Sequence, residues 1–362
     1  MLRSTHRVNK IFSTPAYLSM PSFGLDISDD SIKYMELIST KKGIQVRKYG
    51  EKKIPSGIVE LGKIVDKEKL EEIILELKKQ EKIKDVRVSI LENQIYLFKL
   101  KLDKANISNI KENIELVLEE HIPIPASEAV FDYDIIEETP TKIILQVGAI
   151  QVNIIEDYLA VFENCEINVH SFELEAQAIV RAIIKKEDKD TYMIIDFGEK
   201  RTGIFVVSGG IVMFTSTIDF GGVTFSEMIQ KNLDISFEEA EKIKINIGLQ
   251  RNLENQEIFP ILLNGASVLR DEIQKHFIYW HTHEDEDGSR SPVIKKILLA
   301  GGNSSIIGLA DYFAVSMKTE VEIANVWSNI CDLNNGVPMI PAKKALSFAT
   351  AIGLSLRDFE HD

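Results

Sequence analysis

A strand that ends in an aspartate and turns directly into another strand occurs twice in this chain, once in each half. The first example is Asp26-Ile27-Ser28, in an expected strand over residues 23–28, and the second is Asp196-Phe197-Gly198, after an expected strand over 192–197. In each half, two more short strands follow, as alternating apolar residues and small turn residues indicate. The repetition predicts two α/β halves built on one plan.

This plan divides the 362 residues into an ordered series of parts. A chain of this length has room for about two domains, each with its own core. Short strands and helices fill the region between the two repeats, so we expect an α+β insert there. The expected parts are an N-terminal extension over 1–20, a first domain over 21–188 with the insert at 85–168, a second domain over 189–339, and a last helix over 340–358.

Capping residues and apolar spacing locate the principal helices. Asp66 and Ser236 are expected N-caps, and Ser236-Phe237-Glu238-Glu239 has the form of a capping box. Pro123 and Pro125 end the helix before them, because proline cannot continue a helix. Further helices are expected over residues 153–163, 173–184, 257–280, 304–317 and 342–357.

The charge balance excludes several classes of partner. With 42 Lys and Arg against 56 Asp and Glu, the formal net charge is −14. Such a surface repels phosphate backbones and anionic lipid, so we expect neither nucleic-acid binding nor direct membrane insertion. No apolar run approaches the ~20 residues that span a bilayer, and no secretory signal is recognisable. Cys165 and Cys331 are far apart and are expected to be reduced thiols of a cytoplasmic protein.

The two aspartate-ended strands suggest a phosphate site. A hairpin turn offers backbone N–H groups to phosphate oxygens, and a carboxylate at its base can hold Mg²⁺ through water. Asp26 and Asp196 have this position, and Thr202 adds a hydroxyl near the second turn. Taken alone, each aspartate is more often only the end of a strand and the start of a turn.

Three further elements follow in order and strengthen this interpretation. Gly221-Gly222 precedes a helix, where the backbone can approach a phosphate. Glu241 and Lys244 lie one helical turn apart and could both reach a ribose, although such a pair is often only a solvated i,i+3 pair. Gly301-Gly302-Asn303 follows an apolar strand and leaves room for an adenosine against the backbone.

This ordered set resembles the actin, heat-shock-chaperone and sugar-kinase ATPase superfamily. Within it, the chain is most similar to the PilM family of type IV pilus assembly proteins, from about residue 15 to residue 358. The segments that carry the resemblance are Phe23 to Lys33, Glu119-Glu120-His121-Ile122-Pro123-Ile124-Pro125 with Phe131-Asp132-Tyr133, and Ser347 to Leu354. The second of these is the most specific.

The resemblance implies an α/β, actin-like (ribonuclease H-like) two-domain ATPase fold, in which the helix over 340–358 completes the first domain. It implies ATP and Mg²⁺ as ligands, with Asp26 and Asp196 holding the metal through water. The nucleotide-binding residues that it implies are Asp26, Ser28, Lys33, Asp196, Gly198, Thr202, Gly221, Gly222, Glu241, Lys244, Gly301, Gly302 and Asn303.

The function that the resemblance implies is that of a scaffold. A PilM-like protein binds ATP between its domains and holds the N-terminal cytoplasmic tail of a bitopic inner-membrane protein, PilN, between the first domain's core and the insert. Pilus motor and platform proteins are further possible partners. The protein would then be cytoplasmic and peripheral to the inner membrane. Because Ser28 replaces a common glycine and Asp29 and Asp30 follow it, we expect at most slow ATP hydrolysis.

Two other functions were weighed. An FtsA-like cell-division scaffold shares the fold and an insert, but the residues from Arg357 to Asp362 do not form an amphipathic membrane helix. A sugar or acetate kinase needs a carboxylate base at an acceptor hydroxyl, and none is identifiable. The run from His281 to Asp287 could suggest a metal site but is more typical of a solvated loop, and His121 and His170 are expected to be structural.

Overall fold

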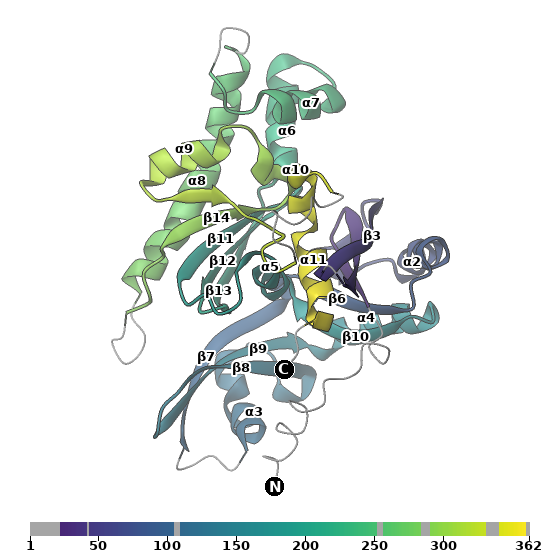
Figure 1. The fold of residues 1–362 in the computed structure, drawn as a ribbon, viewed down its shortest axis with the longest axis vertical. Coiled ribbons are helices and arrows are strands. Elements are labelled where there is room, and N and C mark those ends of the chain that lie inside the picture. The colour runs from purple at the N-terminus through teal and green to yellow at the C-terminus, as the bar shows by residue number, and fades with distance from the viewer. Residues whose placement is uncertain are drawn as a thin grey trace.

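The computed structural model describes residues 22–41, 43–104, 109–251, 256–283, 290–330 and 340–359. The expected N-terminal extension over 1–20, the acidic run over 284–287 and Cys331 lie outside the described residues. Figure 1 shows three sheets, two of which lie side by side with helices between and around them, and a third that projects from one end.

The first sheet has five strands in the order β10-β6-β1-β2-β3. β1 runs antiparallel to β2 and parallel to β6, and β6 runs parallel to β10. Helices α2 (Lys67–Glu81) and α4 (Val152–Asn164) add apolar side chains to its core. The side chain of Asp66 caps α2, as expected. The strands are β1 (Phe23–Ile27), β2 (Ser31–Thr40), β3 (Gly43–Lys53), β6 (Asp85–Ile90) and β10 (Asn168–Leu174), with a small β4–β5 ribbon (Val59–Glu60 and Lys63–Ile64) nearby.

The second sheet repeats this arrangement with the order β13-β12-β11-β14-β15. β11 runs antiparallel to β12 and parallel to β14, as β1 does with β2 and β6. The strands are β11 (Thr191–Phe197), β12 (Thr202–Ser208), β13 (Ile211–Ile218), β14 (Lys296–Ala300) and β15 (Val321–Ile323). The helices of this half are α6 (Gly222–Leu233), α7 (Phe237–Ile247), α8 (Ile258–Thr282) and α9 (Leu309–Met317). The expected capping box begins α7 at Ser236.

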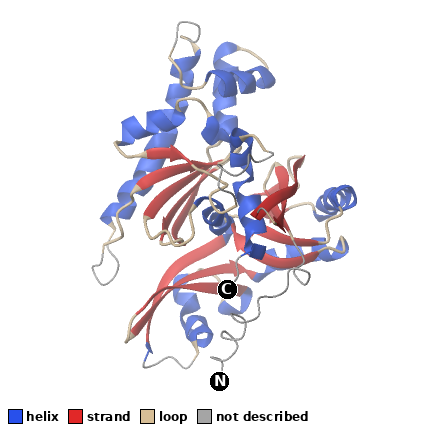
Figure 2. Ribbon diagram, viewed as in Figure 1, coloured by secondary structure: helices blue, strands red, loops and turns tan. Residues whose placement is uncertain are grey.

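The third sheet is small and antiparallel, with the order β7-β9-β8. It consists of β7 (Ile95–Asp103), β8 (Ala129–Glu138) and β9 (Lys142–Gln151), and α3 (Ile110–His121) packs on it through Ile114 and Leu118. Figure 2 shows this sheet set apart from the other two. The insert was expected to begin at residue 85, but β6 pairs with β1 and is buried along most of its length, so the separate sheet starts at Ile95.

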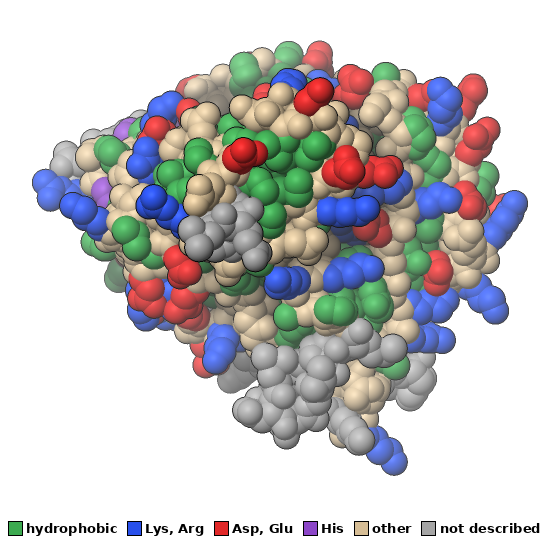
Figure 3. All heavy atoms as spheres, turned by 90° about the horizontal axis from the view of Figure 1, so that it is seen from above, with side chains coloured by type: hydrophobic (Ala, Val, Ile, Leu, Met, Phe, Trp, Pro, Cys, Tyr) green, Lys and Arg blue, Asp and Glu red, His purple; other side chains and the backbone are tan. Residues whose placement is uncertain are grey.

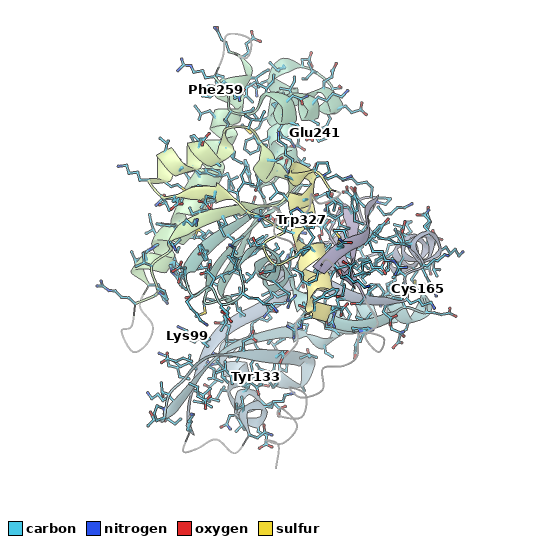
Figure 4. All side chains as sticks on the ribbon, viewed as in Figure 1. Lys99, Tyr133, Cys165, Glu241, Phe259 and Trp327 are labelled. Atoms are coloured by element: carbon cyan, nitrogen blue, oxygen red, sulfur yellow. The ribbon has the colours of Figure 1, made fainter. Side chains whose placement is uncertain are left out.

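Helices α5 (Glu175–Ile183) and α11 (Ala349–Leu356) pack at the junction between the first two sheets. The helix expected over 173–184 begins at Glu175, because the residues before it form β10, a strand that was not predicted from the sequence. The helix expected over 342–357 is divided into α10 (Ala342–Ala345), a 3₁₀ turn and α11. Trp327 is buried at the same junction, near α11 (Figure 4).

The polar groups at this junction join distant parts of the chain. Asp358, just after α11, accepts hydrogen bonds from the backbone N–H and the hydroxyl of Ser22 and from Arg87 Nε.

Figure 3 shows acidic and basic side chains interspersed over the face seen from above. Among the described helices, none is both long enough and apolar enough to cross a membrane.

Candidate functional site

The turn after β1 and the turn after β11 meet at a cavity of about 250 Å³. The two turns belong to different sheets, and each follows a strand that carries an aspartate one residue before its end. The predicted site residues that line this cavity are Asp26, Ser28, Lys33, Asp196, Gly198, Gly301, Gly302 and Asn303. The fold therefore brings together residues that are almost 280 positions apart in the sequence.

Asp26 and Asp196 lie deep in this cavity. Asp26 is 6% exposed and accepts a hydrogen bond from Ser89 Oγ at 2.9 Å. Burial raises the pKa of Asp26, against the opposing effect of Lys33. Burial also raises the pKa of Asp196 to about 7, and the nearby carboxylate of Asp26 adds to the shift. Both carboxylates therefore lack a full counter-charge, which a cation in the cavity would supply.

Two further carboxylates in the cavity, Glu92 and Glu175, were missed by sequence analysis. Burial raises the pKa of Glu92 to about 7, and burial together with Glu92 raises that of Glu175 well above its usual range. Glu92 Oε1 accepts the backbone N–H of Ala176 at 2.7 Å, and Glu175 Oε1 accepts the hydroxyl of Thr350 at 3.2 Å. Their position in the chain could have identified them, because they follow β6 and β10. These strands run parallel to β1, so the ends of all three strands meet at one edge of the sheet.

The loop Ser28-Asp29-Asp30 is rich in internal contacts. Ser28 Oγ donates to Asp30 Oδ1 at 2.9 Å, and Lys53 Nζ lies 3.4 Å from Asp30 Oδ2. Although burial alone would raise the pKa of Asp30, Lys33 and the hydrogen bond from Ser28 hold it below its usual value. The negative charge of Asp30 is thus partly offset by the neighbouring Lys33 and Lys53.

Three more of the predicted residues, Thr202, Gly221 and Gly222, do not line the cavity but lie against or next to the second turn. Thr202 is buried, and its hydroxyl donates to the carbonyl of Phe220 at 2.6 Å. A Cβ atom at Gly221 would overlap the backbone of Glu199, and one at Gly222 would overlap the side chain of Asn303. Glycine is therefore required at position 221, where the overlap is with backbone, whereas a larger residue at position 222 would displace the side chain of Asn303. Asn303 in turn donates to the carbonyl of Gly198 at 2.9 Å, so these residues fix the second turn.

Lys244 and Glu241 do not line the cavity in this structure. Lys244 is 1% exposed, and its Nζ donates to the carbonyl of Gly222 at 3.0 Å and to Glu241 Oε1 at 2.6 Å. Ser226 also donates to Glu241. Figure 4 shows Glu241 on α7, beside α6. The pair therefore joins α7 to the start of α6, and its role at a ribose stays a prediction.

The donor set suits a hydrated divalent cation. Asp26 and Asp196 are acceptor-only ligands when ionised, and a cation between the two turns would offset their charge. Among the residues that the structure describes, no three Asp, Glu, His or Cys side chains converge on a direct metal site. A cation here would thus keep water in its coordination shell.

His121 stacks on Phe98, and His170 contacts Asp85 at 3.0 Å.

Two sheets of one plan, with a carboxylate-bearing hairpin from each facing a shared cavity, define the actin-like class of two-lobed α/β proteins. Within this class the assignment is more specific. The family model described as type IV pilus assembly protein PilM matches residues 24–359, and the chain belongs to this family. This match nearly coincides with the extent of the resemblance seen in the sequence, and it favours neither the cell-division nor the kinase alternative.

Solved structures support the same fold. The chain is similar to a structure titled "PilM-PilN type IV pilus biogenesis complex", with 19% identity, a TM-score of 0.73, and coverage of 94% of this chain and 99% of that one. MreB5 of Spiroplasma citri bound to ADP has 14% identity and a TM-score of 0.58, over 96% and 97% of the two chains. The ethanolamine utilization protein EutJ from Carboxydothermus hydrogenoformans has 17% identity and a TM-score of 0.54, over 94% and 93%.

Proposed function

We propose that this protein is a cytoplasmic, nucleotide-binding scaffold of the type IV pilus assembly platform. The observation that carries the nucleotide part is the convergence of Asp26 and Asp196, from two separate sheets, on one cavity. Mg²⁺ would be held through water by these carboxylates, and the phosphates would lie between the two turns. Gly301 and Gly302 would leave room for the adenosine. The MreB5 neighbour, whose title names ADP, supports a nucleotide as the ligand.

A second cavity, here called the groove, is the proposed partner site. It has a volume of about 1000 Å³ and lies between the small sheet, the first sheet and α5. Its apolar lining includes Ile95, Leu97, Val130, Phe172, Val180 and Ile184. Among the described strands, β8 pairs only with β9, so its other edge is open to an added strand. These features suit a short, extended and partly apolar peptide.

The proposed occupant of the groove is the N-terminal cytoplasmic tail of a bitopic inner-membrane protein of the PilN kind. The similar structure whose title names a PilM–PilN complex supports a partner of this kind. A net charge of −14 opposes direct adsorption to an anionic membrane, so a protein partner would place the chain there. Motor or platform proteins of the pilus would bind elsewhere on the scaffold.

Nucleotide binding is tested by calorimetric titration of Mg-ATP into the wild type and into Asp196→Ala. Because Asp196 would hold the metal, we expect the variant to lose binding while its circular dichroism stays unchanged. Asp157→Ala is the control, since Asp157 of α4 pairs with Lys67 at 2.7 Å and does not line the cavity. Equal affinities in the wild type and Asp196→Ala would refute the assignment of the second turn.

The same samples test the proposed slow turnover. We expect phosphate release well below ~1 per second, the lower end of the ordinary enzyme range. Turnover in the ordinary enzyme range would show that the protein is an enzyme first and not a scaffold.

A further inference from the structure

An ion pair joins the two turns at the nucleotide cavity. Arg201 belongs to the turn between β11 and β12, and Asp29 belongs to the turn between β1 and β2. Arg201 Nη2 lies 3.0 Å from Asp29 Oδ1, and both side chains are nearly buried, with 13% and 11% of their surfaces exposed. Because the two residues come from different sheets, this contact exists only while the two turns are close together.

Asp29 is itself held in place by a backbone N–H group and a lysine side chain. Its Oδ1 accepts the N–H of Gly62 at 3.3 Å, and Lys200 Nζ donates to its carbonyl oxygen at 3.4 Å. The contact between Nη2 of Arg201 and Asp29 Oδ1 restrains one end of the guanidinium, whose donors form a rigid fork. Asp29 therefore limits where the other N–H groups of Arg201 can point.

One part of this guanidinium lacks an acceptor. Arg201 Nη1 is buried and has no hydrogen-bond partner among the described residues, although Arg201 lines the cavity. A buried N–H group without an acceptor is costly, and a charged one more so. An oxyanion in the cavity would satisfy it, and phosphate oxygens match the donor geometry of arginine.

We propose that Arg201 binds the phosphate chain of the nucleotide through Nη1 while Nη2 remains on Asp29. Asp29, in the first half of the molecule, is then a positioning residue that orients the guanidinium of Arg201 in the second half. This inference rests on the proposed nucleotide site and adds a ligand that the sequence did not suggest. It also gives the acid at position 29 a role at a phosphate site, since Arg201 neutralises its charge.

The test compares Mg-ATP and adenosine binding in the wild type, Arg201→Gln and Arg201→Lys. Charge-assisted hydrogen bonds contribute enough that we expect Arg201→Gln to bind Mg-ATP about 10- to 100-fold more weakly. Arg201→Lys should be intermediate, because it keeps the charge but not the fork. Adenosine binding should not change, because adenosine has no phosphate. Arg47→Gln is the control, since Arg47 pairs with Glu36 at 3.1 Å but does not line the cavity.

Two further variants test the positioning role of Asp29. Asp29→Asn keeps the shape but weakens the hold on Arg201, so we expect a smaller loss of Mg-ATP affinity, about 3- to 10-fold. In Arg201→Gln, Asp29 becomes an unpaired charge beside the phosphates. Adding Asp29→Asn to that variant should therefore recover part of the lost affinity, which a purely structural role would not produce.

The outcomes separate the inference from the proposed function. If the wild type does not bind Mg-ATP, the proposed nucleotide site is wrong and this inference fails with it. If the wild type binds Mg-ATP and Arg201→Gln binds it equally well, only the phosphate contact is wrong. Equal or tighter binding by Asp29→Asn would overturn the positioning role of Asp29.

Discussion

At the residue scale, the nucleotide cavity contains several buried carboxyl groups, and the neighbouring cationic side chains do not fully neutralise them. Glu92 shows how such a group can have two tasks. Its Oε1 accepts the N–H of Ala176, one of the first N–H groups of α5 that have no partner within the helix. Its burial, meanwhile, opposes ionisation and raises its pKa to about 7. The hydrogen bond stabilises the fold, whereas the negative charge destabilises it.

This conflict predicts how stability depends on pH. Burial raises the pKa of Glu92 to about 7 in the folded state, above the ordinary value of 4.5, so the folded state binds the proton more tightly than the unfolded state. The free energy of unfolding should therefore fall as pH rises from about 4.5 to about 7, in metal-free buffer. Glu92→Gln cannot ionise, and its amide oxygen can still accept the N–H of Ala176. We expect it to be more stable than the wild type at pH 8, by on the order of 2 kcal/mol, and similar at pH 4.5.

Urea denaturation of both proteins at pH 4.5 and pH 8, with a chelator present, measures this difference. Glu163→Gln, at an exposed position of α4, controls for the loss of one negative charge. A Glu92→Gln variant that is less stable than the wild type at pH 8 would show that the ionised carboxylate stabilises the fold.

At the scale of elements, the arrangement of the two large sheets depends on the contact between α5 and α11. α5 begins at the nucleotide cavity with Glu175 and passes along the groove at Val180. α11 crosses it closely: a Cβ atom at Gly353 would overlap the carbonyl oxygen of Ala178, and Arg181 Nη1 donates to the carbonyl of Gly353 at 3.0 Å. The two helices therefore touch through their backbones.

Gly353→Ala should consequently be severely destabilising. A backbone carbonyl inside two packed helices cannot move aside as a side chain can, so we expect a loss of about 3 kcal/mol or more. Gly148→Ala in β9 is the matched control, because a Cβ there would meet only ordinary contacts with Ile95 and Leu97. Thermal melting measures both. A Gly353→Ala protein that melts with the wild type would mean that the helices can separate at little cost.

At the scale of the whole molecule, the cavity and the groove occupy different junctions of the three sheets. The cavity lies between the two large sheets, and the groove lies beside the small sheet, with α5 along both. Figure 1 shows the small sheet extending away from the rest, joined to it through β7 and β9. A partner that binds in the groove would therefore hold the small sheet against the body of the protein.

Partner binding is predicted to depend on the face of β8 that lines the groove. Val130 is 44% exposed and lines the groove, so Val130→Arg should fold normally and yet abolish binding of a PilN-type tail peptide. Ile135→Arg is a control on the same strand, because Ile135 is 46% exposed but does not line the groove. Fluorescence anisotropy with a labelled tail peptide measures both affinities. Equal binding by Val130→Arg and the wild type would place the partner elsewhere.

Local patterns were sufficient for much of the fold. The strand that ends near Asp26 and the strand that ends near Asp196, the caps at Asp66 and Ser236, and the proline-terminated helix before Pro123 are all signals within a few residues. They located these elements, and the resemblance of the ordered motifs to a known superfamily implied the actin-like fold class, which the comparisons confirm. β10 was missed because it is a short edge strand with polar residues such as His170 and Glu173 among its apolar ones, which periodicity cannot distinguish from the helix that follows.

The sequence by itself determined most of the strands and the principal helices, because these depend on neighbours along the chain, and its motifs carried the resemblance to the family that the comparisons confirm. Only the tertiary structure decided which side chains share a cavity. Glu92, Glu175 and the Asp29–Arg201 pair could not be found from spacing, since they meet through parallel strand ends and through turns from different sheets. Lys244 shows the same limit: the spacing did not reveal that its amine contacts the carbonyl of Gly222 as well as Glu241, and the ribose contact stays a prediction. Pairing between distant strands sets these contacts, and no local pattern encodes it.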